Sequence, residues 1–139
     1  MPAPFHLDIM TPERSFFSGD VEGIVVGTPD GEIGILAHHE PMLTPLTIGS
    51  IRLNVGGTWK EAFLSEGFLE VGHRRTVIFS QACEWPEEID IRRAEEDRKL
   101  FEEKLRQQTS IREYKTNKIA MARAMARLRV THTQRYNLK

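Results

Sequence analysis

The stretch Cys83-Glu84-Trp85-Pro86-Glu87-Glu88 separates two parts of the chain that are built from different residues. All 10 glycines and all 7 prolines occur at or before Pro86, and neither residue occurs after it. Glycine and proline punctuate turns and are disfavoured inside helices. We therefore predict a turn-rich domain over residues 1–86 and a helical domain over residues 87–139, with the boundary at Trp85-Pro86.

The first part consists of short apolar segments between turn signals. Residues 5–10 alternate apolar and polar side chains with the period of two that a half-buried strand shows. Thr28-Pro29-Asp30-Gly31 and Gly56-Gly57 predict turns between further strands. These strands are expected at 21–26, 33–36, 48–55, 59–64, 68–71 and 76–82. Strands this closely spaced are typical of an antiparallel β-sandwich or flattened barrel.

The second part is predicted to form two helices joined by the polar segment 107–110. Pro86 suits the first position of a helix. Acidic residues follow in the first turn, where the helix dipole favours negative charge: Glu87, Glu88 and Asp90. Ser110 and Glu113 match a capping box, which predicts the start of the second helix.

The apolar stripe on each helix is thin. It consists of Ile91, Ala94, Phe101 and Leu105 on the first helix, and of Ile111, Tyr114, Met121, Met125 and Leu128 on the second. Each helix is also near the length at which an isolated helix is marginal in water. We therefore expect an antiparallel hairpin that is weakly held, so that a ligand or a partner can move it.

The net charge of −1 is divided unevenly along the chain. Residues 1–86 sum to −6 and residues 87–139 to +5. Residues 111–139 alone carry 8 basic groups against the single Glu113. The C-terminal end is therefore a cationic segment that favours an acidic surface.

Composition and motifs argue against several classes of protein. No apolar run approaches the ~20 residues that cross a bilayer, and the N-terminus lacks a signal core, so we expect no direct membrane insertion. The single cysteine, Cys83, excludes an internal disulfide, and its apolar neighbours predict a core position. No glycine-rich segment ends in the Lys-Ser/Thr of a Walker loop. His38-His39 lacks an apparent third ligand, so we expect no metal site. No Ser, Cys or acid pair has a recognisable catalytic setting, so we expect no catalytic site.

Five segments together carry information about the family. They are FHLDIMTP at 5–12, GEIGIL at 31–36 with His39, Pro41 and Leu43 after it, SEGFLEV at 65–71, IDIRRA at 89–94 and RAMARL at 123–128. In this order they resemble the epsilon subunit of bacterial and chloroplast F-type ATP synthases, along nearly the whole chain. The chain differs from that family at Glu66, which replaces a glycine, at Leu100, where nucleotide-binding members carry a basic residue, and at Ala37-His38, where many members have Pro-Gly.

The resemblance implies an α+β chain that acts as a non-catalytic rotor subunit of the central stalk. It implies that residues 1–86 bind the gamma subunit and the ring of c subunits. Residues 87–139 would form a regulatory hairpin that extends its basic helix toward the beta and alpha subunits and inhibits ATP hydrolysis. The complex would hold the chain peripherally at the cytoplasmic face of the cell membrane. The c-ring contacts expected from the resemblance are Asp30, Glu32, His38, His39 and Glu40.

In some bacterial members of that family the folded hairpin binds ATP at an Ile/Leu-Asp-x-x-Arg-Ala motif. The resemblance therefore implies no required cofactor, with ATP, together with Mg²⁺, as a regulatory ligand. The residues it implies are Glu84, Ile89, Asp90, Arg93, Ala94, Arg123 and Arg127. Carboxylates can accept hydrogen bonds from adenine or ribose, and arginines neutralise phosphates. From the residues alone, Asp90 and Arg93 equally fit an ordinary i, i+3 ion pair on an exposed helix face.

Two other classes of function stay open at this point. A nucleic-acid-binding module would use the basic C-terminal end, but the negative first part and the scarcity of interleaved aromatic residues argue against it. A small hydrolase would use His38 or His39, and it predicts turnover or metal uptake by the purified protein. The residues favour a stalk subunit over both.

Overall fold

The computed structural model describes residues 2–107 and 110–137, and the chain divides into two compact units. We call Met1–Glu84 the sandwich unit and Trp85–Lys139 the helical unit. The division falls between Glu84 and Trp85, next to the predicted boundary at Trp85-Pro86. Glycine and proline usage therefore changes along the chain where the fold changes.

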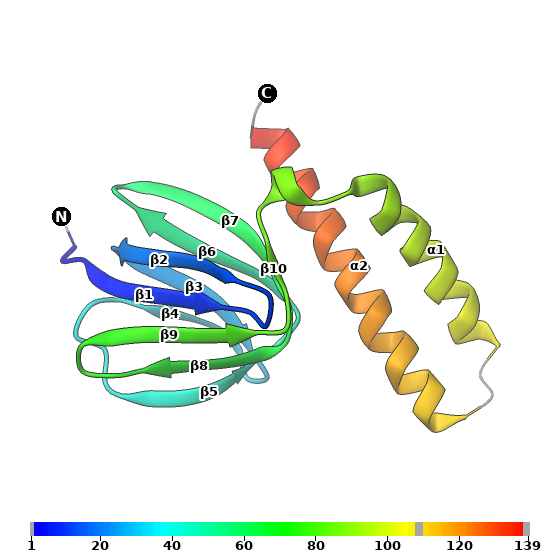
Figure 1. The fold of residues 1–139 in the computed structure, drawn as a ribbon, viewed down its shortest axis with the longest axis horizontal. Coiled ribbons are helices and arrows are strands. Elements are labelled where there is room, and N and C mark those ends of the chain that lie inside the picture. The colour runs from blue at the N-terminus through cyan, green and yellow to red at the C-terminus, as the bar shows by residue number, and fades with distance from the viewer. Residues whose placement is uncertain (1, 108–109, 138–139) are drawn as a thin grey trace. The chain divides into compact units, whose positions relative to one another are not determined.

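Within the described residues, the sandwich unit consists of two five-stranded β-sheets (Figure 1). Sheet A has the strand order β2-β1-β9-β8-β5, and sheet B has the order β10-β7-β6-β3-β4. The strands are β1 (Phe5–Met10), β2 (Ser15–Val21), β3 (Gly23–Thr28), β4 (Gly31–Ile35), β5 (Met42–Leu46), β6 (Gly49–Val55), β7 (Thr58–Leu64), β8 (Gly67–Val71), β9 (Arg75–Ser80) and β10 (Cys83–Glu84). The predicted α+β class, a β-sandwich followed by two helices, is confirmed.

The core between the two sheets is formed by fully buried aliphatic side chains and by Phe63. The aliphatic members include Leu7, Ile9, Ile24, Ile51, Leu53, Leu64, Leu69 and Ile78. Full burial of one such side chain stabilises the fold by roughly 1.5–3 kcal/mol. Cys83 is also buried, which confirms its predicted core position.

One pair of strands, β1 with β9, is parallel, whereas the other pairs of sheet A are antiparallel. His6 lies opposite Arg75, and Ile9 lies opposite Ile78. The first strand is therefore inserted between β2 and β9, so that both ends of the sandwich unit contribute to one sheet.

Two predicted turns are confirmed by the backbone. Gly56 and Gly57 join β6 to β7 with φ values of 59° and 85°, the positive values that a two-residue hairpin turn of this kind requires. In the turn between β3 and β4, Gly31 has a φ of 117°, and the Thr28 hydroxyl donates to its carbonyl oxygen at 2.7 Å.

The strand predictions were wrong at residues 21–26 and missed strands β2, β5 and β10. Residues 21–26 do not form one strand, because β2 ends at Val21 and β3 begins at Gly23. Strand β5 was not predicted, because Pro45 cannot donate to a sheet ladder. This proline is tolerated because β5 lies at the edge of sheet A.

Helix α1 (Ile91–Arg106) begins at Ile91, so the predicted start at Pro86 was wrong. Pro86–Glu88 form a separate 3₁₀ turn, and Ile89 and Asp90 have extended backbones with ψ values of 125° and 98°. The Asp90 carboxylate accepts a hydrogen bond from the Arg93 backbone N–H at 3.0 Å. Asp90 is therefore the N-cap of α1 rather than a charge inside its first turn.

Helix α2 (Ile111–Asn137) packs against α1 as the predicted antiparallel hairpin (Figure 1). The Ser110 hydroxyl accepts from the Glu113 backbone N–H at 3.1 Å, which confirms the predicted start of α2. Helix α2 has 27 residues, so the expectation of two helices of marginal length was wrong for it. Its alanines favour a long helix. In the described residues, no helix is both long enough and apolar enough to cross a membrane.

Candidate functional site

An apolar row crosses the outer surface of sheet A. Strand register places Pro45, Phe68, Phe79 and Met10 side by side on β5, β8, β9 and β1, and we call these four residues the apolar row. The rings of Phe68 and Phe79 are 5.0 Å apart, and these residues are 42% and 38% exposed. Leu43, which is 70% exposed, lies next to the row on β5. Exposed apolar surface that continues across several strands is typical of an interaction site.

The apolar row was not among the sites predicted from the sequence. Phe68 and Phe79 point outward, whereas their neighbours Leu69 and Ile78 are fully buried. Strands β8 and β9 therefore each carry a phenylalanine on the outer face, although a half-buried strand usually has a polar outer face. This departure from alternation is the signal that could have identified the surface.

Asp30 and Glu32, two of the predicted c-ring contacts, lie in and beside the turn between β3 and β4. Glu32 accepts from the Arg52 guanidinium at 2.9 Å, and both side chains are exposed. Glu61 lies opposite Arg52 on β7, and burial raises the pKa of its carboxyl, an effect that the Arg52 charge opposes and the Glu32 charge reinforces. Glu32 is therefore part of a charged cluster on sheet B.

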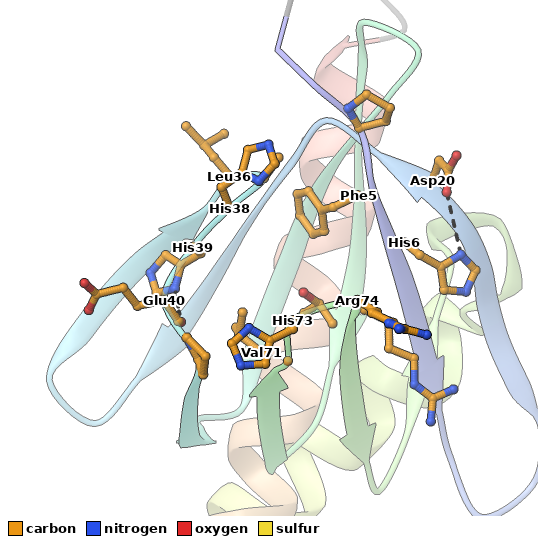
Figure 2. Close-up of a pocket in the computed structure, with 16 residues that line it drawn as sticks. Phe5, His6, Asp20, Leu36, His38, His39, Glu40, Val71, His73 and Arg74 are labelled. Atoms are coloured by element: carbon orange, nitrogen blue, oxygen red, sulfur yellow. Dashed lines mark hydrogen bonds and ion pairs between the residues drawn. The ribbon is translucent and has the colours of Figure 1, made fainter.

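The other predicted c-ring contacts, His38, His39 and Glu40, line a cleft of about 560 Å³ at one end of the sandwich unit (Figure 2). We call it the end cleft. Its opposite wall is the turn 72–74 between β8 and β9. The residues 38–40 of the end cleft come after the last residue of β4, whereas Asp30 and Glu32 lie on either side of its first residue. The structure does not bring the two groups together, and a partner that contacts both must span the length of β4, about 17 Å.

His38 has a left-handed backbone conformation, with a φ of 64° that favours glycine. We expect His38→Gly to raise the free energy of unfolding by roughly 0.5–1 kcal/mol, because the strain relieved exceeds the extra freedom of glycine in the unfolded chain. Chemical denaturation measures this difference. His39→Gly is the matched control, and it should lower the free energy of unfolding. A loss of stability in both variants would contradict the expectation.

The predicted ATP-binding residues are divided between the two units. Glu84 is half-buried in β10 of the sandwich unit, and the others belong to the helical unit. Ile89 and Ala94 are buried, whereas Asp90 and Arg93 are exposed. The alternative reading of Asp90 and Arg93 as an ion pair is wrong, because the carboxylate caps the helix and the two side chains form no salt bridge among the described residues.

Arg123 and Arg127 are half-buried and lie one turn apart on α2. Leu128, the residue after Arg127, lines a cleft of about 460 Å³ together with Ile91 and Glu95 of α1. Arg127 therefore lies level with the first turn of α1, and Arg123 lies one turn farther along the antiparallel hairpin. The lining of this cleft does not include the predicted ATP-binding side chains.

The two helices differ in how their charges are satisfied. Three of the four arginines of α1 form ion pairs with acidic residues of the same helix: Arg92 with Glu96, Arg98 with Glu102, and Arg106 with Glu102. On α2, four exposed basic residues form no ion pair with any described residue: Arg112, Lys115, Lys118 and Arg129. We call these four the α2 cations. They are available to an acidic partner.

Models of known protein families match both units of the chain. The model of the ATP synthase delta/epsilon chain, beta-sandwich domain, matches residues 4–86. The model of the ATP synthase delta/epsilon chain, long alpha-helix domain, matches residues 87–132. The chain belongs to the ATP synthase delta/epsilon family. The resemblance seen in the five sequence segments is thereby confirmed.

Members of the delta/epsilon family from several bacteria resemble this chain over most of its length. The ATP synthase epsilon chain of Caldanaerobacter subterraneus subsp. tengcongensis is 48% identical over 131 residues, which cover 94% of this chain and 95% of that protein. The ATP synthase epsilon chain of Caldicellulosiruptor saccharolyticus is 47% identical over 133 residues, with 96% and 97% covered.

Two solved structures share the fold of this delta/epsilon family chain. A chain in the mitochondrial ATP synthase of Euglena gracilis (OSCP, F1 and c-ring) superposes with a TM-score of 0.78 at 23% identity, covering 91% of this chain and 80% of that one. A chain in the central stalk and c-ring of the Tetrahymena thermophila mitochondrial ATP synthase gives a TM-score of 0.64 at 12% identity, covering 94% and 98%.

Proposed function

We propose that this chain is the epsilon subunit of an F-type ATP synthase and acts as a non-catalytic rotor part of the central stalk. The observation that carries the proposal is that both units match one family, in order, over residues 4–132. The bacterial relatives that align with more than nine tenths of the chain are named ATP synthase epsilon chain. The matched Tetrahymena chain comes from a central stalk and c-ring.

The apolar row is the surface that we assign to the gamma subunit. Its two aromatic rings and the neighbouring Leu43 would be buried by a partner. Interfaces are anchored by a few aromatic side chains that a partner desolvates. A permanent neighbour in the stalk accounts for aromatic residues that would otherwise be exposed to water.

The two ends of β4 are the surfaces that we assign to the c ring. Asp30 and Glu32 lie at one end, and His38, His39 and Glu40 lie at the other. A ring of repeated subunits offers a surface broad enough to contact both. This contact would hold the chain peripherally at the cytoplasmic face of the cell membrane.

The helical hairpin is the part to which we assign inhibition of ATP hydrolysis. Helix α1 pairs three of its four arginines with its own acidic residues, whereas α2 presents the α2 cations. An acidic surface on the beta or alpha subunits would attract this helix through steering and charge-assisted hydrogen bonds. Positioned there, the hairpin would block the rotation that accompanies hydrolysis.

ATP is the ligand that we assign to the folded hairpin. Arg93 is exposed and forms no ion pair among the described residues, so its guanidinium is available to a phosphate. Arg127 lies level with the same turn of α1, and Asp90 keeps one carboxylate oxygen beyond the one that caps the helix. Saturation at about 100 times the dissociation constant would stabilise the folded form by about 2.7 kcal/mol.

Calorimetric titration of the whole chain with ATP and Mg²⁺ tests this ligand. We expect saturable heat that Arg93→Gln reduces by at least about tenfold in affinity, because a charge-assisted contact to phosphate is lost. Arg92→Gln is the matched control and should bind as the wild type does, because Arg92 is paired with Glu96. Asp90→Asn is preferred to Asp90→Ala, since alanine also removes an N-cap that contributes about 1 kcal/mol. A flat wild-type titration would end the ATP proposal and leave the stalk role intact.

Reconstitution tests the stalk role itself. We expect the chain to co-elute in a fixed ratio with an alpha, beta and gamma complex of a bacterial relative, and not with an alpha and beta complex that lacks gamma. The physical reason is that the apolar row requires a partner of matching shape. Failure to bind the gamma-containing complex, combined with steeply salt-dependent retention on nucleic acid, would favour the nucleic-acid-binding alternative.

A further inference from the structure

Four of the five histidines of the chain line the end cleft (Figure 2). His6 comes from β1, His38 and His39 come from the connection between β4 and β5, and His73 comes from the turn between β8 and β9. Histidine is the side chain whose ordinary charge change falls between about pH 5 and pH 8. The end cleft is therefore a place where several charges appear together as the pH falls.

Some charged groups around the end cleft are already paired. The His6 ring lies 3.1 Å from the Asp8 carboxylate and 3.6 Å from the Asp20 carboxylate. Arg75 lies 3.6 Å from Asp8. Hydrogen bonds from the Ser18 hydroxyl and then from His6, together with the His6 and Arg75 charges, keep the pKa of Asp8 below its ordinary value despite desolvation. This group on β1, β2 and β9 satisfies its own charges.

The remaining charged groups of the end cleft, on the segment 38–40 and on the turn 72–74 opposite it, are not paired in this way. No ion pair joins His38, His39, His73 or Arg74 to a described carboxylate, and Glu40 is the acidic residue beside them. The His39 Nδ1 atom lies 2.7 Å from the Glu40 carbonyl oxygen, which can only accept, so Nδ1 is the donor of this hydrogen bond. With neutral histidines the Arg74 and Glu40 charges cancel. With three protonated histidines the net charge of these five residues is +3.

The backbone gives an independent reason to regard the segment 38–40 as functional. His38 has a positive φ, in a conformation that glycine adopts without strain. Strained residues of this kind concentrate at ligand-binding and switch sites. The chain therefore keeps a titratable side chain in the end cleft at a cost in stability.

We propose that the end cleft binds a phosphate-class oxyanion when its histidines are protonated and releases the anion when they are neutral. The Arg74 guanidinium and the imidazolium N–H groups would donate charge-assisted hydrogen bonds to the anion. A free phosphate or polyphosphate and an anionic phospholipid headgroup share this chemistry. The sandwich unit contains the whole lining of the cleft, and the wall formed by His38, His39 and Glu40 is also the surface that we assign to the c ring, so the anion and the ring would compete for it.

The test is a titration of the full chain with sulfate and with inorganic phosphate, followed by the imidazole C–H signals in NMR at constant ionic strength. Sulfate is included because its charge does not change over the range used. We expect affinity at least about tenfold higher near pH 5.5 than near pH 8, because two or more charge-assisted hydrogen bonds appear on protonation. The shifted signals should be those of His38, His39 and His73.

Matched variants localise the site. The double variant His39→Gln/His73→Gln should bind at low pH no better than the wild type does at high pH. His132→Gln, which changes the histidine of α2, should behave as the wild type does. Arg74→Gln should weaken binding at both pH values. Unchanged binding in the double variant, or affinity that does not vary with pH, would overturn the proposal.

A second arm identifies the source of the anion. Vesicles of phosphatidylglycerol and of phosphatidylcholine are sedimented with the chain near pH 5.5. Retention by phosphatidylglycerol vesicles without binding of the free anions would identify a lipid headgroup as the ligand. Binding of the free anions without vesicle retention would identify a soluble phosphate. Binding of neither would overturn the proposal, and the reconstitution with gamma would be unaffected.

Discussion

Phe68→Glu is expected to weaken binding of the gamma subunit by about 100-fold or more, because interface aromatic residues contribute about 2 kcal/mol or more and a buried charge adds a desolvation penalty. Phe68 lies in the middle of the apolar row, with its ring 5.0 Å from that of Phe79. Its side chain is partly exposed in the chain alone, so the variant should fold. Co-elution with gamma and a binding titration measure the effect.

Two further variants make this result interpretable. Trp59→Glu changes a large residue that is 54% exposed on β7 of sheet B, and it should bind gamma as the wild type does. Leu43→Glu changes an exposed residue beside the apolar row and should weaken binding without affecting the core. Normal gamma binding by both Phe68→Glu and Leu43→Glu would show that gamma docks on another surface.

Ending the chain after Glu84 should separate assembly from inhibition. The sandwich unit has its own core between two sheets, and the apolar row lies entirely within it. The truncated chain should therefore still bind gamma. The reconstituted complex with the truncated chain should hydrolyse ATP about fivefold faster or more than the complex with the full chain. This factor is the lower end of the range for a typical coupling between two sites.

A full-length variant distinguishes loss of charge from loss of the hairpin. Changing the α2 cations to glutamine keeps both helices, and it should also raise the hydrolysis rate if an acidic surface holds α2 in the inhibitory position. The increase should be largest at low ionic strength, where exposed charges are least screened. Truncation that abolishes gamma binding would contradict the division of roles between the two units.

Much of the fold could be predicted because local residue choice and tertiary structure agree. Glycine and proline usage indicated the two architectures, and the turns at Gly31 and at Gly56-Gly57 have the positive φ values that their residues favour. Strand β5 was missed because Pro45 is acceptable only at a sheet edge, and an edge is defined by the whole topology. The start of α1 was misplaced because Asp90 is equally suited to an N-cap and to a first helical turn.

The candidate surfaces were less predictable, because each depends on segments that are distant in the chain. Met10 and Phe79 become neighbours only through the parallel pairing of β1 with β9. His6, His39 and His73 share the end cleft only because the start of β1 and two connections meet at one end of the sandwich. The motif around Asp90 was visible in the sequence, but its capping role follows from backbone angles that no residue pattern specifies.

The parallel pairing of β1 with β9 also has a consequence for biosynthesis. Strand β1 leaves the ribosome first and can form its hairpin with β2 at once, but its other edge stays open until residues 75–80 have been translated. Contacts between such distant segments form slowly, and an unpaired strand edge is prone to aggregation. The nascent sandwich is therefore most vulnerable during the interval before β9 emerges, and it closes only shortly before synthesis of the helices begins.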